Sequence, residues 1–381
     1  MFKESLTINN FPLFYGPLDE AVLKHLPSTI SLSLGVDSDY NLIRLKVDKE
    51  LESLLETTYQ CGSNPSVPLG KGSIQSKIMK SIVRELENFY RHKEDFEIVE
   101  IGCGEGRLLQ ALNQTGLKVS GYEISPTAQI AKSHSDITII QDYFTFESGK
   151  LYDLIFSYCV LEHIIDLKDF FLQGYQSLKE GGVFCHIVPN CETMLSQGNL
   201  RMLSHQHISY FTPQSLISLF RQFGLQNVHH TIISPGNSLM VYGYKKTQDN
   251  DMAPVLDNNS PELMDHFTKN FSTSLQKLQL FLDESLHKNQ KVAFYAGGMS
   301  EYLILERNET ILFVNGDTEM WDKKIFLNLD KIHAPSEMHL FKPDIIVVFA
   351  THYFDEIKQF INNQLKLENS ATIVSIDEII H

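Results

Sequence analysis

Two histidines at alternate positions, His205 and His207, are the residues best suited to proton transfer. They lie in the segment Ser-His-Gln-His-Ile-Ser-Tyr, in which Tyr210 is the nearest aromatic residue. A neutral imidazole accepts a proton near physiological pH, so either histidine could act as a general base, and His207 is the stronger candidate. The alternative is that both are structural histidines that hold a loop.

A second group of residues is suited to ligand binding. Three alternate glycines, Gly102, Gly104 and Gly106, follow an apolar stretch and precede residues with helical spacing. Glycine lets a ligand approach the main chain closely, and a helix N-terminus leaves N–H groups free. Glu100 would lie beside this turn, where an acid can meet a cation. The stretch Val99–Arg107 resembles the first motif of class I S-adenosylmethionine (SAM) methyltransferases, although an ordinary glycine-rich turn is the alternative.

Acidic residues end the next two expected strands. Glu123, followed by Ile124, could accept hydrogen bonds from two ribose hydroxyls. Asp142 could accept from the adenine amino group, and Tyr143 could lie against the adenine ring. The alternatives are a surface glutamate and a turn aspartate.

The fourth expected strand, 151–158, leads into Leu-Glu-His-Ile at 161–164. This segment resembles the fourth-strand motif of the same methyltransferases, in which His163 either is catalytic or packs under the cofactor. Because ligands bind at the carboxyl ends of strands in open α/β sheets, the motifs should meet at one edge. The resemblance implies SAM as cofactor, bound by Glu100, Gly102, Gly104, Gly106, Glu123, Ile124, Asp142, Tyr143, Tyr158 and His163.

The elements that must position these residues alternate between strand and helix over 94–246, which predicts an open, largely parallel α/β sheet. The remaining chain predicts a small N-terminal domain (1–75), a SAM-binding domain (76–246), a connector and long helix (247–288), and a smaller Rossmann-like α/β domain (289–381). In the last domain, 297–306 is expected to form a turn and helix.

Nearly the whole chain resembles the three-domain C-methyltransferases that act on nucleotide-linked keto-deoxysugars. The segments that carry this resemblance are 32–45, 235–239, 293–298 and 343–356. It implies a zinc-binding N-terminal domain, yet Asp37, Ser38 and Asp39 stand where zinc-ligating cysteines are expected. We therefore expect no metal there and a domain held by packing alone.

The family's Tyr-His-Glu-His catalytic segment is also altered, because Ser204 and Gln206 replace the tyrosine and the glutamate. Methylation at carbon, which needs an α-proton removed and an enolate stabilised, is in doubt on this basis. Methylation at oxygen needs one base, which His207 could provide, with Tyr59, His205 and Tyr210 near the acceptor.

Composition limits the other functions. The 381 residues are enough for two or three domains, and the net charge of -15 without a basic cluster disfavours nucleic-acid binding. Five cysteines, none in a Cys-x-x-Cys pair, argue against a zinc or disulfide framework and suit a reducing cytoplasm. Neither a signal peptide nor an apolar run of about 18 residues is present, so we expect no membrane insertion.

These observations predict a cytoplasmic SAM-dependent methyltransferase acting on a sugar or nucleotide-sugar in glycan or secondary-metabolite biosynthesis. Two alternatives remain: a SAM-binding scaffold protein that has lost its chemistry, and an O-methyltransferase of a non-sugar small molecule. The glycine spacing gives poor support to a nicotinamide-dependent dehydrogenase. The sequence leaves open whether the chain forms a homo-oligomer.

Overall fold

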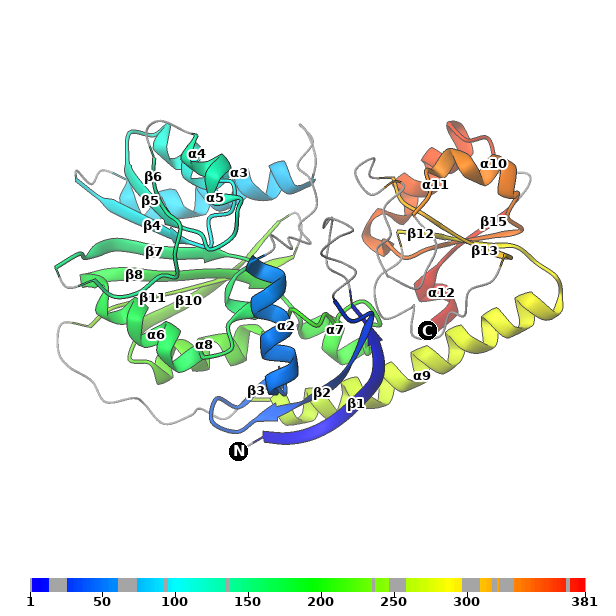
Figure 1. Cartoon of the computed structure of the whole chain (residues 1–381), viewed down its shortest axis with the longest axis horizontal. Coiled ribbons are helices and arrows are strands. Elements are labelled where there is room, and N and C mark those ends of the chain that lie inside the picture. The colour runs from blue at the N-terminus through cyan, green and yellow to red at the C-terminus, as the bar shows by residue number, and fades with distance from the viewer. Residues whose placement is uncertain are drawn as a thin grey trace.

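In a computed structural model of the chain, the described residues form three β-sheets and the helices that cover them (Figure 1). The expected helix at 297–306, Cys61 and the connector before residue 258 lie outside the residues that the structure describes. The described residues are 2–13, 26–60, 74–91, 95–133, 137–147, 149–234, 237–246, 258–296, 309–316, 321, 332–367 and 371–380.

The central sheet has seven strands in the order β10-β11-β8-β7-β4-β5-β6. Five strands run parallel, namely β4 (Glu97–Ile101), β5 (Lys118–Tyr122), β6 (Thr138–Ile140), β7 (Tyr152–Tyr158) and β8 (Leu178–Pro189). The last two form the expected antiparallel pair, β10 (Gln226–Ile233) and β11 (Ser238–Tyr244), and β11 runs antiparallel to β8. The predicted α/β fold with a largely parallel sheet is confirmed.

Both faces of the central sheet are buried, because its strands contribute residues to two different apolar clusters. In β7, Phe156 joins the cluster that contains α3 (Ile74–Tyr90) and α4 (Arg107–Asn113), whereas Ile155 joins the cluster that contains α6 (Leu167–Gln176) and α8 (Pro213–Gln222). A short α5 (Ala128–Lys132) connects β5 to β6. Strands buried on both faces read as continuous apolar runs, which is why the sequence predicted them.

The N-terminal sheet is antiparallel, with the order β1-β2-β3-β9. It contains β1 (Phe2–Pro12), β2 (Thr29–Asp37), β3 (Leu42–Leu45) and β9 (Ser209–Tyr210), and α2 (Lys49–Gln60) follows β3. The strand β9 comes from the segment expected to belong to the SAM-binding domain. The histidine-rich segment therefore runs from the central sheet into the N-terminal one.

An ion pair contributes to this sheet, which corrects the expectation that packing alone holds it. Arg44 on β3 lies 3.1 Å from the Asp37 carboxylate at the end of β2, and both side chains are largely buried. A buried pair of this kind cross-links neighbouring strands at a position where the family resemblance led us to expect metal ligands.

The C-terminal sheet is parallel, with the order β13-β12-β14-β15. Its strands are β12 (Val292–Tyr295), β13 (Ile311–Val314), β14 (Ile345–Val348) and β15 (Thr372–Ser375), and the helices α10 (Met338–Phe341), α11 (Phe354–Asn363) and α12 (Ile376–Ile380) accompany them. The buried residues of β12 and β14 divide between two apolar clusters, as they do in the central sheet.

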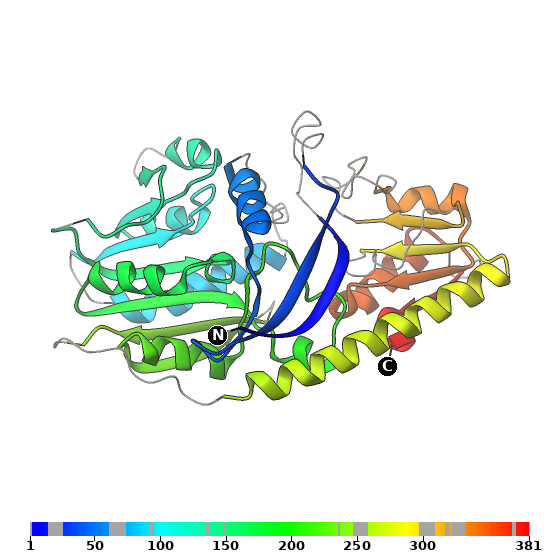
Figure 2. The ribbon, with the colours of Figure 1, turned by 60° about the horizontal axis from the view of Figure 1, so that its bottom comes forward.

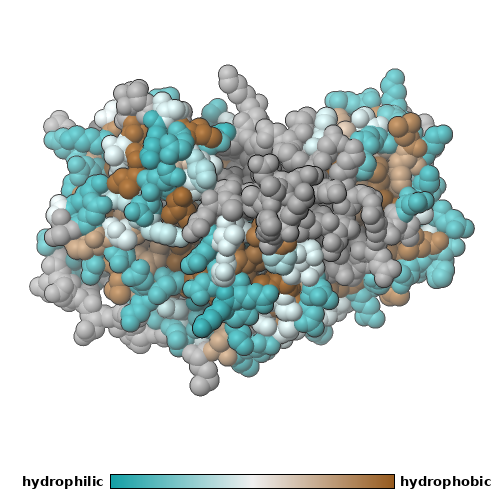
Figure 3. Space-filling model, in the orientation of Figure 1, coloured by the Kyte–Doolittle hydropathy of each residue, from teal (hydrophilic) through white to brown (hydrophobic). Residues whose placement is uncertain are grey.

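The long helix α9 (Ser260–His287) joins the N-terminal and C-terminal sheets, as Figure 2 shows. One apolar cluster contains residues of both sheets, of α9 and of α7 (Glu192–Gln197). On the face seen in Figure 3, hydrophobic side chains lie in separate small patches among hydrophilic ones. No helix among the described residues has the length and apolar character needed to cross a lipid bilayer.

Candidate active site

The three alternate glycines form a left-handed turn between β4 and α4. Their φ angles are 68° for Gly102, 53° for Gly104 and 73° for Gly106, a region in which other residues are strained. A Cβ placed on Gly104 would meet no atom of the described residues within 4 Å. The backbone of the turn is therefore open on this side, as close approach by a ligand requires.

Glu123 holds this turn from the end of β5. Its Oε2 accepts a hydrogen bond from the Gly104 N–H at 2.8 Å, and its Oε1 accepts from the Ser125 N–H at 2.7 Å. Each carboxylate oxygen has two lone pairs, so further acceptor capacity remains for ligand hydroxyls. The carboxylate is only 9% exposed and is fixed by main-chain donors.

Glu100 lies near Glu123 and is buried. Among the described residues, no hydrogen-bond partner meets its Oε2. Burial, with a smaller contribution from the charge of Glu123, raises the pKa of Glu100 well above its usual range. A ligand cation at this place would satisfy the carboxyl group and favour its ionised form.

The other residues predicted to bind the cofactor lie at the same carboxyl edge of the sheet and differ in exposure. Asp142 and Tyr143 are exposed, and the Asp142 Oδ1 accepts from the Tyr143 N–H at 2.8 Å. Ile124 and Tyr158 are half-buried. Their predicted contacts with adenine and the rest of the cofactor remain predictions.

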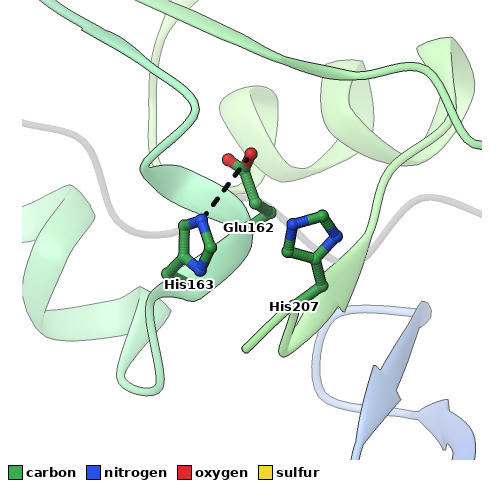
Figure 4. A group of neighbouring side chains, drawn as sticks. All are labelled: Glu162, His163 and His207. Carbon is green, nitrogen blue, oxygen red and sulfur yellow. Dashed lines mark ion pairs between the residues drawn. The ribbon is translucent and has the colours of Figure 1, made fainter. Parts of the chain in front are cut away.

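A second group of side chains converges beyond the end of β7 (Figure 4). Glu162 and His163 lie on the short 3₁₀ helix Leu161–His163, and His207 approaches them from the segment before β9. One ligand atom from each lies within 4.8 Å of the others, and the rings of His163 and His207 are 5.1 Å apart. The alternate-histidine pattern and the Leu-Glu-His motif thus meet in one place.

Hydrogen bonds set the tautomer of His163. Its Nδ1 lies 2.8 Å from the main-chain carbonyl of Gln206 and 3.1 Å from the Tyr59 hydroxyl. Because a carbonyl only accepts, we assign the ring proton to Nδ1. The lone pair on Nε2 then points toward Glu162, whose Oε1 is 4.0 Å away.

Burial controls the charge of this cluster. It raises the pKa of Glu162 to about 8, and it lowers the pKa of His163 to about 4 and that of His207 to about 3. At neutral pH the carboxyl group is mostly protonated and both imidazoles are neutral. Among the described residues, neither Glu162 oxygen has a hydrogen-bond partner of ordinary geometry, and the Cys159 thiol, a weak donor, lies close enough to lower the Glu162 pKa in part.

The other two predicted catalytic residues are fully buried. His205 has no exposed surface, and the Tyr210 hydroxyl contacts the main-chain N–H and carbonyl of Ser204, each at 3.3 Å. The His207 N–H also donates to the Ser204 carbonyl. Tyr210 therefore supports the turn that presents His207, and a direct catalytic role for it or for His205 remains a prediction.

Two residues of this region, Glu162 and Arg44, were not assigned a role from the sequence. Glu162 lies in the Leu-Glu-His-Ile motif, and the feature that could have indicated its role is an acidic residue in a largely apolar segment. Arg44 interrupts the apolar strand Leu42–Leu45, and nothing in the sequence indicated which groups it would contact. Tyr59, expected near the acceptor, does reach His163.

The same three residues form the one group with metal-ligand spacing that a search of the described chain found. Two imidazoles and a carboxylate suit a divalent transition metal, and a main-chain carbonyl on Nδ1 is common for a metal-bound histidine. Both the predicted metal-free site and a metal-loaded one are compatible with these positions.

The glycine turn contacts the segment that leads into the convergent cluster. A Cβ placed on Gly102 would lie 2.5 Å from Cγ2 of Val160, two residues before Glu162. In addition, β4 and β7 are parallel neighbours, with Ile101 paired to Ser157. A ligand on the glycine turn would therefore lie close to the Glu162–His163–His207 cluster.

Comparison with known proteins identifies the central region. Residues 73–230 match a family model described as a methyltransferase domain. The C-methyltransferase NovU of Streptomyces niveus is 29% identical over 170 residues, which are 42% of this chain and 40% of NovU. A ubiquinone biosynthesis O-methyltransferase of Roseobacter denitrificans is 27% identical over 172 residues, covering 40% of this chain and 69% of the relative.

A solved structure of PigF with SAH is 18% identical and covers 46% of this chain and 56% of PigF, with a TM-score of 0.39. The match to NovU spans less than half of the length of NovU.

The residues present fit the cofactor of methyltransferases. SAM carries two cationic groups and a ribose. The site offers the Glu100 Oε2, which has no partner among the described residues, the spare acceptor capacity of Glu123 and an open glycine backbone. Residues 73–230 therefore match a methyltransferase domain, and the residues of the site fit S-adenosylmethionine as its cofactor.

Proposed function

We propose that the chain transfers a methyl group from SAM to a small-molecule acceptor, which binds at Glu162, His163 and His207. The observation that carries this proposal is the convergence of these three side chains beside the glycine turn. A buried carboxyl group without a partner is costly, on the order of 1–3 kcal/mol, and a bound acceptor would supply the missing contact.

On the donor side, the proposed roles follow from charge. SAM supplies a methyl group that its sulfonium sulfur makes electrophilic. The Glu123 carboxylate fixes the turn and accepts from ribose hydroxyls, while Glu100 balances positive charge. Gly102, Gly104 and Gly106 keep the backbone open for close approach.

On the acceptor side, His207 is the proposed base. Its ring is neutral at physiological pH, so a lone pair is available to take a proton from the acceptor as the methyl group is transferred. His163, fixed through Nδ1 by the Gln206 carbonyl and in contact with Tyr59, orients the acceptor from the opposite side.

Glu162 extends this chemistry beyond a single base. Kept mostly protonated at neutral pH, its carboxyl group can donate a hydrogen bond to an oxygen that becomes negatively charged. Removal of a proton next to a carbonyl group requires a base for the proton and a hydrogen-bond donor for the carbonyl oxygen, and this site offers both. This pairing favours methylation at carbon, whereas methylation of a hydroxyl would need His207 alone.

We propose a sugar or nucleotide-sugar as the acceptor. The family resemblance of the whole chain supports this class, and the similarity to NovU supports transfer to carbon. The parallel C-terminal sheet offers a second carboxyl edge, at the ends of β12 and β14, for the remote half of a large acceptor.

The test is incubation of the purified chain with SAM and a panel of keto-sugar nucleotides, hydroxyl-bearing sugar nucleotides and catechols. Mass spectrometry detects methylated product, and NMR locates the new methyl group on carbon or oxygen. We expect carbon methylation of a keto-sugar nucleotide. Transfer to catechols alone would overturn the sugar assignment, and SAM binding without transfer to any acceptor would favour the scaffold alternative.

A further inference from the structure

Arg44 lies in the N-terminal sheet, outside the methyltransferase domain, yet its side chain reaches the site. It projects from β3, a strand whose other residues are leucine and isoleucine, and only 9% of the side chain is exposed. A guanidinium group stays charged at all relevant pH values, so its burial requires compensating contacts.

The compensating contacts come from three separate segments. Nη1 lies 3.1 Å from the Asp37 carboxylate, which neutralises the charge. Nε donates to the Ser209 hydroxyl at 3.1 Å. Nη2 donates to the carbonyls of Ile165 at 2.6 Å and Ile164 at 3.2 Å.

Two of these segments carry the proposed acceptor site. Ile164 and Ile165 directly follow His163, and Ser209 is two residues after His207. Main-chain hydrogen bonds continue the connection, because the Ile208 N–H donates to the Glu162 carbonyl at 2.7 Å. One planar group thus holds the segment with Glu162 and His163 against the segment with His207.

We infer that Arg44 is a positioning residue that sets the separation and orientation of His163 and His207. Its Asp37 partner keeps the guanidinium in place from the neighbouring strand. The catalytic consequence of this arrangement rests on the proposed function, whereas the structural consequence does not.

Lysine cannot reproduce these contacts. A guanidinium presents donors in a fixed fork to several acceptors at once, whereas an ammonium group is a compact point charge. Arg44→Lys therefore preserves the charge opposite Asp37 and loses much of the link to the carbonyls of Ile164 and Ile165. Ser209→Ala removes one contact with little change of volume, and Arg84→Met in the exposed part of α3 is a matched control.

The experiment is nitrogen NMR of the histidine rings at pH 7 in the full chain, with SAM affinity measured by calorimetry on the same samples. In the wild type we expect a proton on Nδ1 of His163, which faces the Gln206 carbonyl. In Arg44→Lys we expect mixed tautomers of His163, with SAM affinity unchanged. Ser209→Ala should show a smaller change in the same direction, and Arg84→Met none.

Once an acceptor has been identified, Arg44→Lys should lower kcat by about tenfold to a hundredfold and leave KM for SAM unchanged, because small displacements of catalytic groups lower the reaction rate strongly. An unchanged tautomer of His163 in folded Arg44→Lys and Ser209→Ala would overturn the inference. Altered histidine signals together with no methyl transfer by the wild type would instead contradict the proposed function alone.

Discussion

Two buried glutamates at the ends of β5 and β7 differ in how the protein satisfies them. Glu123 is 9% exposed, and each of its oxygens accepts a main-chain N–H. Glu162 is 2% exposed, neither of its oxygens has a partner of ordinary geometry among the described residues, and its pKa is raised to about 8. Glu123 is thus satisfied within the protein, whereas Glu162 is left without an ordinary hydrogen bond.

This difference indicates a structural role for the Glu123 carboxylate and a chemical role for the Glu162 carboxyl group. A satisfied carboxylate rigidifies its surroundings, as Glu123 does for the Gly104 turn. An unsatisfied carboxyl group costs stability, and its pKa rises; such groups are common at catalytic sites. Substitutions at the two places should therefore affect different observables.

The largest effect is expected from His207→Ala. Removal of the base should lower methyl transfer by about a hundredfold to ten-thousandfold, because general base catalysis contributes that much. SAM binding should persist, since His207 lies on the acceptor side. Turnover at the wild-type rate in a variant that binds SAM normally would show that another group takes the proton.

The pH dependence of stability should reveal Glu162. Its pKa is about 8 in the folded protein and near 4.5 when unfolded, so between these values the folded state binds the extra proton. The contribution of Glu162 to the free energy of unfolding is therefore fully present below pH 4.5. It is lost as pH rises toward 8, by about 1.4 kcal/mol per pH unit.

Urea unfolding at several pH values measures this contribution as the difference between wild type and Glu162→Gln. The variant should gain stability relative to the wild type as pH rises from 5 to 8. Parallel profiles for the two proteins would mean that Glu162 ionises normally in the folded state.

Metal removal should have the smallest effect. If His207 acts as a base, treatment with a chelator and gel filtration should leave methyl transfer unchanged, because no step then needs a Lewis acid. Loss of activity that returns on addition of Zn²⁺ or Mn²⁺ would assign Glu162, His163 and His207 to a metal centre instead.

The central sheet and its glycine turn could be predicted from the sequence because local signals encode them. Strands buried on both faces read as apolar runs, and Gly102, Gly104 and Gly106 mark the turn. The placement of Glu123 beside Gly104 followed from the rule that parallel strands end at one edge.

Features that depend on distant pairing could not be predicted. The strand β1 is largely polar and is defined by its pairing with β2, while β9 has only two residues and exists through its pairing with β3. Arg44 lies more than 100 residues from the carbonyls that it contacts, so its role appears only in the folded chain. The protonation state of Glu162 likewise depends on tertiary burial.

SAM calorimetry on Glu123→Ala and Glu162→Gln tests the contrast between the two halves most directly. Glu123→Ala should weaken SAM binding by about tenfold to a hundredfold, because it removes acceptors for charge-assisted hydrogen bonds and frees the Gly104 turn. Glu162→Gln should bind SAM as the wild type does. Equal losses in the two variants, or a loss in Glu162→Gln alone, would contradict the assignment of Glu123 to the donor side and of Glu162 to the acceptor side.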